Sequence, residues 1–420
     1  MAYLIKIIIL CTYFISLYFS IFWLVTLEEK LSKVKQEKKN KKQPTVYPFV
    51  SIIIPAYNEE DTVQSTIASV LNLDYPKNCY EIIVIDDGST DSTSEKIDAS
   101  IKNNSSVPVI FKKQKNQGKA AALNWGLSKS KGDFFACLDA DSVVESDILK
   151  KMLLFYQEHE KNIVIVTPLM KIVKPKNLLQ KFQRVEYILA AFIQRLMGDI
   201  DCIYIAPGPF SLYRTKIIQD LGGFDEKNIT EDQEIAYRVQ SHHFKIRQCP
   251  EAFVRTVAPR NLAEFYKQRN RWFKGSLFNL MKYKKMFLNR KYGDFGIFQL
   301  PLNLSVYLLG IITFCFFTYY IVKPIWQTVY KIILLNFDIG TILKQFFSSS
   351  FDILQLDLGI MFVLYVALSI ALYFFYVSHQ FSNEKMFEEG VVYLFPYFFL
   401  YYVLLSVISI IVLLEMIVGK

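Results

Sequence analysis

Apolar residues are distributed unevenly along the chain. Long apolar runs lie near both ends, whereas residues 48–293 carry short β-branched runs separated by turns and amphipathic segments. The runs IIIP, IIVID and FFACLDAD lack polar alternation, as expected for parallel strands that helices cover on both faces. The pattern therefore predicts a doubly wound, mostly parallel α/β sheet in the middle of the chain.

Four apolar segments are predicted to cross a membrane, namely residues 3–27, 297–322, 358–377 and 391–418. About 20 apolar residues in a helix span a hydrocarbon core of about 30 Å. A cleaved signal peptide is disfavoured at the first segment, because the run is long and no small-residue cleavage site follows. Residues 325–350 include Lys331, Asp338 and Lys344, which favours an interfacial or re-entrant helix and leaves an extra crossing open.

A run of lysines follows the first apolar segment, at residues 28–42 (EEKLSKVKQEKKNKK). Lys and Arg are enriched on the cytoplasmic side of membrane spans. The run therefore predicts that the α/β lobe is cytoplasmic, that residues 379–390 return to the cytoplasm, and that both chain ends lie outside. The whole chain is expected to be a multi-pass protein of the plasma membrane, in contact with membrane lipid.

The composition agrees with a membrane protein that carries a soluble lobe. Hydrophobic residues make up 52% of the chain and charged residues 21%, and the mean hydropathy is +0.23. The net charge is +9, but the basic run has no interleaved aromatic residues, which disfavours nucleic acid as a partner. The six cysteines form no CxxC pair, so neither a disulfide framework nor a zinc site is indicated.

Two amphipathic helices are predicted, at residues 177–197 and 262–287. Both would suit the cytoplasmic surface of the membrane, where an apolar face enters the headgroup region. For the first helix, burial of its apolar stripe inside the lobe is an equally good interpretation.

Three predicted strands end in polar clusters, at residues 57–59 (YNE), 86–88 (DDG) and 139–141 (DAD). Each cluster alone fits a turn or a helix cap. Ligands of open α/β sheets bind outside the carboxyl ends of strands, so the three together favour a site. Asp139 and Asp141, at i and i+2, point the same way and suit a shared Mg²⁺ or Mn²⁺ that also binds substrate phosphates.

No GxxxxGK[ST] loop and no GxGxxG follows the first strand, which argues against a P-loop ATPase and a nicotinamide enzyme. A nucleotide diphosphate would instead be held by Asp87 and the loop after the first strand, with Lys119 as a candidate cation. Taken alone, Lys119 also fits a solvated helix start. Thr230 likewise fits a simple helix cap, and Trp272 could pack on the lobe while Arg271 faces water.

The ordered motifs PAYNE (55–59), DDGS (86–89), GKAAALN (118–124), DAD (139–141), TED (230–232) and QRNRW (268–272) resemble glycosyltransferase family 2. The resemblance covers about residues 48–320 and is greatest to the processive membrane synthases of cellulose, chitin, hyaluronan and poly-N-acetylglucosamine. It implies a GT-A-type catalytic domain at 48–260 and an interfacial helix with QRNRW at 261–295. A membrane helix (1–28) and a basic linker (29–47) would precede these, and a region with about three spans (296–420) would follow.

The resemblance also assigns roles to individual residues. It implies that Asp232 is the general base, with Glu231 beside it, and that Asp139 and Asp141 bind the metal. The implied nucleotide-sugar residues are Pro55, Ala56, Tyr57, Glu59, Asp87, Lys119 and Asp139, and those for the acceptor and diphosphate are Gly208, Gln268, Arg271 and Trp272.

The implied activity is inverting transfer from a UDP-sugar, UDP-GlcNAc in particular, to a growing β-linked polysaccharide that the spans export. The compact chain is nearer in layout to the poly-N-acetylglucosamine and hyaluronan synthases than to the cellulose synthases. Four spans are few for a polysaccharide channel, which leaves room for a small membrane accessory subunit. The alternatives are a transferase that adds one sugar to a polyprenyl phosphate or other lipid, and a transporter or scaffold that binds a nucleotide sugar without turnover.

Overall fold

The structure is a computed structural model that describes residues 14, 17–19, 21–26, 46–102, 106–159, 162–334, 340, 358–385 and 394–418. The chain divides into two compact units. The apolar unit comprises Met1–Ser32, Ser305–Val377 and Gly390–Lys420, and the α/β unit comprises Lys33–Leu304 and Ser378–Glu389. The lysine run at 28–42 and most of the predicted span at 3–27 lie outside the described residues.

The α/β unit is built on an eight-stranded sheet with the order β3-β2-β1-β4-β7-β6-β8-β5. The strands are β1 (Val50–Ala56), β2 (Tyr80–Asp86), β3 (Val109–Lys113), β4 (Phe134–Cys137), β5 (Val143–Val144), β6 (Ile163–Ile172), β7 (Ser211–Arg214) and β8 (Lys245–Thr256). Strands β1 to β4 are parallel, whereas β7 runs antiparallel to β4 and β6, and β5 runs antiparallel to β8. Strand β8 is parallel to β6, so only β7 and β5 oppose the common strand direction. The predicted mostly parallel α/β sheet is therefore confirmed, with two antiparallel strands that make it mixed.

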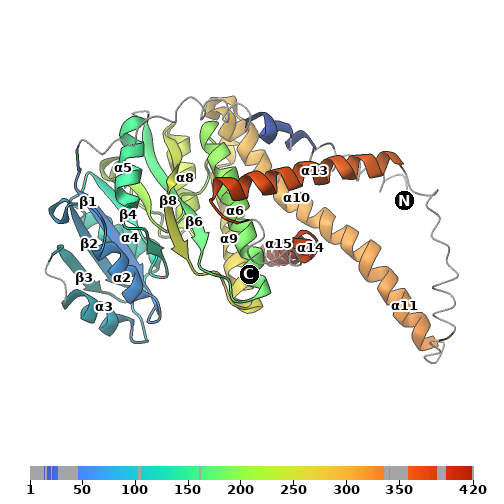
Figure 1. The fold of residues 1–420 in the computed structure, drawn as a ribbon, viewed down its shortest axis with the longest axis horizontal. Helices are drawn as coiled ribbons and strands as arrows, with labels where there is room; N and C mark the ends of the chain where they lie inside the picture. The colour runs from blue at the N-terminus through green and yellow to red at the C-terminus, as the bar shows by residue number, and fades with distance from the viewer. Residues whose placement is uncertain are drawn as a thin grey trace. The chain divides into compact units, whose positions relative to one another are not determined.

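Helices cover both faces of this sheet. They are α2 (Val63–Leu71), α3 (Thr93–Lys102), α4 (Lys119–Lys129), α5 (Ile148–Glu158), α6 (Leu178–Asp199), α7 (Thr215–Asp220), α8 (Glu231–Ser241) and α9 (Leu262–Lys282). In β1, Ile52 and Ile54 join a buried cluster with Val63 of α2, whereas Ile53 packs against α4. Burial on both faces explains why these strands have no polar alternation. Figure 1 shows α2 and α3 beside β1–β3, and α6 and α9 towards β6 and β8.

The helices α6 and α9 begin side by side. Asn177 and Asn261 cap them by accepting hydrogen bonds from the amides of Gln180 and Glu264. Asn177 Nδ2 also donates to the carbonyl of Arg260 at 2.8 Å, just before α9. These contacts fix the register of the two helices at their N-termini.

The two helices differ in burial. In α6 the predicted apolar stripe is mostly buried in the unit, with only Leu178 well exposed, which favours burial over a membrane-surface position. In α9 the apolar side chains of Leu262, Phe278 and Met281 are exposed.

The apolar unit contains the longest helix, Phe295–Leu334, whose first residues belong to the α/β unit. It has 40 residues with a mean hydropathy of 1.9 in its most apolar window, and it is the one helix among the described residues that is long and apolar enough to cross a membrane. It comprises a π-helical turn (Phe295–Gln299), α10 (Leu300–Phe317), a second π-helical turn (Thr318–Val322) and α11 (Lys323–Leu334).

Residues 325–334, predicted as the start of an interfacial or re-entrant helix, instead continue the helix of the predicted span at 297–322. The second π-helical turn directly precedes Pro324, whose missing amide hydrogen would interrupt a regular helix. The rest of the predicted interfacial segment lies outside the described residues, apart from residue 340. The remaining apolar helices are α13 (Leu358–Phe381) and α15 (Tyr402–Val418), the latter preceded by α14 (Leu394–Pro396) and a π-helical turn (Tyr397–Tyr401).

Candidate active site

The loops after β1 and β2 are bound to each other. The amide of Asn58 donates to Ser89 Oγ at 3.0 Å, and Asn58 Oδ1 accepts from the amide of Thr90 at 2.8 Å. The amide of Glu59 donates to Thr93 Oγ1 at 2.8 Å. The PAYNE and DDGS motifs thus form one rigid edge of the site.

The predicted nucleotide-binding residues of the PAYNE motif differ in exposure. Tyr57 is 48% exposed and free to meet a ligand, whereas Pro55 and Ala56 are buried in β1. The carbonyl of Ala56 accepts a hydrogen bond from the amide of Asp87 at 2.9 Å. Ala56 therefore supports the site through its backbone.

Asp86 and Asp87 are buried, and hydrogen-bond donors surround them. Burial by itself raises the pKa of Asp86, but hydrogen bonds from Ser89 and Ser94 outweigh it and hold the pKa below its ordinary value. Asp87 Oδ1 accepts from Gln114 Nε2 and the amide of Gln117, and its Oδ2 accepts from the amide of Gly118. Asp87 thereby fixes the loop that leads into α4.

Lys119, the first residue of α4, joins two motifs that are far apart in sequence. Its Nζ lies 2.6 Å from Asp139 Oδ1 and 3.0 Å from Glu231 Oε1. Burial opposes the charge on Lys119, but Asp139 and Glu231 raise its pKa well above the ordinary value. The ion pairs rule out the interpretation of Lys119 as a solvated helix start.

Gly208 lies directly against this ion pair. A Cβ built on Gly208 would stand 2.6 Å from Asp139 Oδ2 and 2.7 Å from Lys119 Nζ. Any side chain here would displace the charged groups, which is a physical reason for glycine at this position. The loop is also tied to α8, because the amide of Ala206 donates to the carbonyl of Asp232 at 3.1 Å.

Three acids of the site have raised pKa values. Burial raises the pKa of Asp232 to about 6, and the negative charge of Glu231 adds to this, against the opposing effects of Lys119 and Arg271. Burial and then Asp139 raise the pKa of Asp141. Burial also raises the pKa of Glu59, with smaller contributions from Asp141 and Asp139.

Asp139 and Asp141 lie close enough for the charge of Asp139 to act on the carboxyl group of Asp141. Among the described residues no group of three or more His, Cys, Asp or Glu side chains is placed to hold a metal ion. A divalent cation would offset the negative charge around Asp141.

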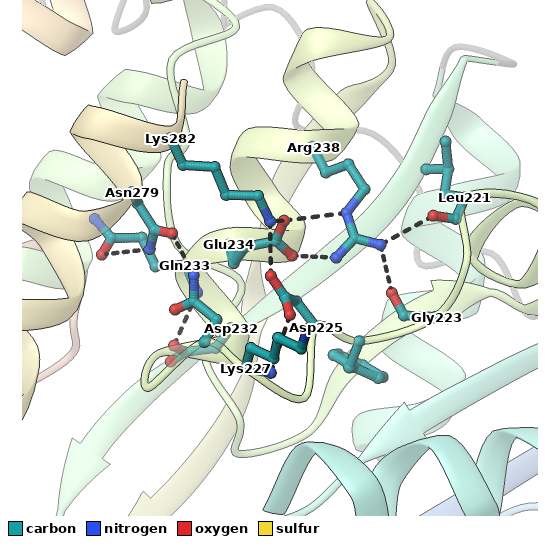
Figure 2. Close-up of polar contacts among 12 residues, drawn as sticks. Leu221, Gly223, Asp225, Lys227, Asp232, Gln233, Glu234, Arg238, Asn279 and Lys282 are labelled. Atoms are coloured by element: carbon teal, nitrogen blue, oxygen red, sulfur yellow. Dashed lines mark hydrogen bonds and ion pairs between the residues drawn. The ribbon is translucent and has the colours of Figure 1, made fainter. Parts of the chain in front are cut away.

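The helix α8, which carries Glu231 and Asp232, is fixed to α9 by a buried carboxylate (Figure 2). Glu234 is fully buried and accepts hydrogen bonds from Arg238, from Lys282 Nζ at 2.5 Å and from Tyr283 Oη at 2.7 Å. Lys282 also donates to Asp225 Oδ2 at 2.7 Å. The sequence analysis missed this network, although Glu234 and Arg238 stand at helical i, i+4 spacing.

A second contact between α8 and α9 lies next to Thr230. The side chain of Asn279 donates to Thr230 Oγ1 at 3.1 Å, and Gly275 packs against the Thr230 side chain with no room for a Cβ atom. Thr230 is the N-cap residue of α8, as one interpretation of the sequence has it, but its side chain makes no cap hydrogen bond to the helix.

The QRNRW motif lies on α9 with its two arginines on different faces. Arg271 is exposed, but it is near enough to Glu231 and Asp232 to lower the pKa of both. Trp272 is half-buried, and the side-chain oxygen of Gln268 is buried without a hydrogen-bond partner in the described part of the chain. The sequence analysis missed Arg269, which is buried and paired with Glu186 of α6.

Comparisons with known proteins identify the family of this site. A profile described as "Glycosyl transferase family 2" matches residues 51–222. A Bacillus subtilis protein, "Probable glycosyltransferase YdaM", is 31% identical over 294 residues, which are 69% of this chain and 68% of that protein. The chain belongs to glycosyl transferase family 2. It is therefore an enzyme, a glycosyltransferase.

Other relatives of this glycosyltransferase agree. The "Poly-beta-1,6-N-acetyl-D-glucosamine synthase" of Staphylococcus aureus (strain MSSA476) is 31% identical over 287 residues, covering 65% of this chain and 68% of that protein. A solved structure, the mannosyltransferase PcManGT from Pyrobaculum calidifontis in complex with GDP-Man and Mn²⁺, shares the fold, with a TM-score of 0.56 and 16% identity. The likeness covers 82% of this chain and 99% of that chain.

Proposed function

We propose that this glycosyltransferase is an inverting membrane enzyme that uses a UDP-sugar, UDP-GlcNAc in particular, to extend a β-linked polysaccharide. The similarity to poly-β-1,6-N-acetyl-D-glucosamine synthases supports the donor and the product. The observation that carries the proposal is the raised pKa of Asp232, to about 6, beside the group of Lys119, Asp139 and Glu231.

Asp232 is proposed as the general base. A base that works near neutral pH needs a pKa close to the working pH, and burial together with Glu231 moves Asp232 towards it. Above this pKa the carboxylate can take the proton of an acceptor hydroxyl as that oxygen attacks the anomeric carbon. The exposed Arg271 and the half-buried Lys119 balance the negative charge that Asp232 and Glu231 then share.

The nucleotide sugar is proposed to bind along the edge formed by Tyr57, Glu59 and Asp87. Both carboxylate oxygens of Asp87 accept hydrogen bonds from residues 114–118. Asp87 is therefore proposed to shape this loop as well as to face the nucleotide base. Lys119 stands next to Asp139 and suits the diphosphate as a cation.

Asp139 and Asp141 would hold Mg²⁺ or Mn²⁺, since carboxylate oxygens suit both ions. The pair fits such a cation because Asp141 already lies in a negative, desolvated environment. When bound, the cation supplies positive charge to the diphosphate that leaves the sugar. The described residues offer no third acidic or imidazole ligand in this group, so substrate oxygens and water would complete the coordination.

The acceptor is proposed to contact Gly208, Gln268 and Trp272. Gly208 allows close approach to Asp139, and the buried oxygen of Gln268 is available for a ligand's hydroxyl group. The half-buried Trp272 offers an aromatic face to a sugar ring.

We also propose the membrane arrangement of the whole chain. It comprises four spans, a basic linker at 29–47, a cytoplasmic catalytic domain at 48–260, and an interfacial α9 whose Leu262, Phe278 and Met281 are exposed. The helix Phe295–Leu334 is long and apolar enough for the first span after the catalytic domain. A small accessory subunit would complete a channel that these spans are too few to form.

The test incubates membranes that contain the protein with UDP-GlcNAc, UDP-glucose or UDP-glucuronate, with Mg²⁺ or Mn²⁺, and sizes the product. We expect a metal-dependent polymer from UDP-GlcNAc that Asp232→Asn membranes do not make. A labelled product that carries one sugar and extracts into organic solvent would overturn polymerisation in favour of transfer to a lipid. Binding of the donor without turnover would overturn catalysis itself.

A further inference from the structure

Arg269 is a buried arginine in the first half of α9, within the QRNRW motif. Only 4% of the residue is exposed, and its Nη2 lies 2.5 Å from Glu186 Oε2. Glu186 belongs to α6, which starts beside α9 and is held there through Asn177. The ion pair therefore joins two helices whose register is already fixed at one end.

The guanidinium of Arg269 also stacks on aromatic rings of its own helix. Its central carbon lies 4.3 Å from the centroid of the Trp272 ring and 4.9 Å from that of Phe265. A cation over an aromatic face is attracted by the ring quadrupole, and a planar guanidinium can lie flat on the ring. Arg269 thus pairs its charge with Glu186 and lies over the rings of Trp272 and Phe265.

These contacts constrain Trp272 more than the ordinary packing of a half-buried ring. The indole is held on one side by a group that cannot leave, because separation from Glu186 would leave a buried charge unpaired. The orientation of the ring is then set by α6 as well as by α9.

We propose that Arg269, held by Glu186, is the positioning residue that fixes the Trp272 ring for the acceptor sugar and thereby sets acceptor affinity and product length. This inference rests on the proposed role of Trp272 in acceptor binding. Neither Arg269 nor Glu186 touches the reacting atoms. Their substitution acts on acceptor binding and leaves donor binding intact.

The first test is Arg269→Lys, which keeps the charge and removes the planar stack. We expect the KM for an oligosaccharide acceptor to rise about 10-fold and the products to become shorter, while the KM for the UDP-sugar stays within about twofold. The matched control is Arg255→Lys, in a more exposed pair with Glu145 at 3.1 Å. Equal acceptor KM and product length in Arg269→Lys and wild type would overturn the proposal.

A second test separates positioning from mere stabilisation. The exchanged pair Glu186→Arg with Arg269→Glu restores opposite charges but puts a carboxylate against the ring. We expect it to recover thermal stability relative to either single variant, but not the acceptor KM. Recovery of both, or of neither, would contradict a role that depends on the guanidinium stack.

A third test asks whether Arg269 acts through Trp272. In a Trp272→Ala background, Arg269→Lys should raise the acceptor KM no further, since the ring that it positions is gone. Fully multiplicative effects would overturn the proposal. If the wild-type protein uses no oligosaccharide acceptor, the proposed polysaccharide function is wrong. If wild type and Arg269→Lys use the acceptor equally well, only the positioning role of Arg269 is wrong.

Discussion

Asp86, at the end of β2, and the two acids Asp141 and Asp232 belong to one site but have opposite electrostatic environments. Asp86 accepts hydrogen bonds from Ser89 and Ser94 and has a lowered pKa. Asp141 and Asp232 are desolvated beside like charges, and their pKa values are raised. Asp86 stabilises the loops that form the edge of the site, whereas Asp141 and Asp232 are held ready for a proton or a cation.

The direction of the pKa shift indicates the role of a carboxylate in this site. Its position at the end of a strand or helix indicates that role less well. Asp86 ends a strand, Asp141 lies in the turn that follows β4, and Asp232 lies in the first turn of a helix. Hydrogen bonds from Ser89 and Ser94 offset the burial of Asp86, whereas the burial of Asp141 and Asp232 is not offset in this way, which makes the latter two candidates for binding or catalysis. The substitutions below test this division, in order of the expected effect on turnover.

Asp232→Asn is expected to have the largest effect. The amide keeps the shape but cannot accept the proton, so turnover should fall about 10²- to 10⁴-fold, the usual contribution of a general base. Rates of sugar transfer under saturating donor measure it. Asp220→Asn, at an exposed acid paired with Lys216, is the control and should keep wild-type rates. Near-normal turnover in Asp232→Asn would remove Asp232 from the role of base.

Asp87→Ala is expected to weaken donor binding. Loss of the carboxylate leaves the amides of Gln117 and Gly118 without their acceptor, which costs about 1–3 kcal/mol of stability and loosens the loop before Lys119. The KM for the UDP-sugar should rise about 10-fold, with a smaller change in kcat. A large loss of kcat with an unchanged KM for the UDP-sugar would contradict this role and group Asp87 with Asp141 and Asp232.

Lys119→Met is expected to shift the pH profile. Lys119 lowers the pKa of Asp232, so its removal should raise that pKa above 6 and move the acidic limb of kcat/KM to higher pH. Rates between pH 5 and 9 reveal the shift. Lys129→Met, at an exposed lysine of the same helix, should keep the wild-type limb. Movement of the acidic limb of kcat/KM to lower pH would contradict the conclusion that Lys119 lowers the pKa of Asp232.

Glu384→Gln is expected to have the smallest effect on turnover. Glu384 pairs with Arg184 of α6 and lies 3.2 Å from Lys171 Nζ, so it is a satisfied acid outside the site. The amide leaves two partly buried cations underpaired, and we expect a loss of about 1–3 kcal/mol of stability with turnover within about threefold. Thermal unfolding and the transfer assay measure the two effects. A collapse of turnover at unchanged stability would link Glu384 to catalysis.

Sequence patterns predicted the α/β sheet and the grouping of the motifs, because buried strands leave continuous apolar runs and strand ends share one edge. The mixed strand order was beyond reach, since β7 and β5 have only four and two residues and leave no periodic signal. Of the predicted spans, one helix that meets the length and hydropathy criteria lies among the described residues.

Within the site, the motifs nominate residues but do not give their contacts. The pairing of Lys119 with Asp139 and Glu231 joins three distant segments, which a single sequence does not report. Arg269 could have been suspected, because Phe265, Arg269 and Trp272 follow the i, i+4, i+7 spacing of one helix face. The pKa of Asp232 depends on burial and neighbours, and only the fold supplies these.

The most direct test of the account compares the thermal stability of Asp232→Asn and Asp86→Asn between pH 4 and pH 8, without donor and with a chelator. The folded protein holds the proton of Asp232 up to about pH 6, whereas the unfolded chain releases it near 3.8, so the wild type loses stability as the pH rises between these values. The pH dependence that Asp86 contributes has the opposite sign. Its lowered pKa stabilises the folded protein above pH 3.8, and this stability is lost as the pH falls through the pKa of the folded state.

At pH 7.5 the account therefore predicts that Asp232→Asn is more stable than wild type, by at most about 3 kcal/mol, and that this gain disappears towards pH 4. Asp86→Asn should be less stable than wild type at pH 7.5. Destabilisation of both variants to the same extent at that pH would contradict the division between the two groups of acids.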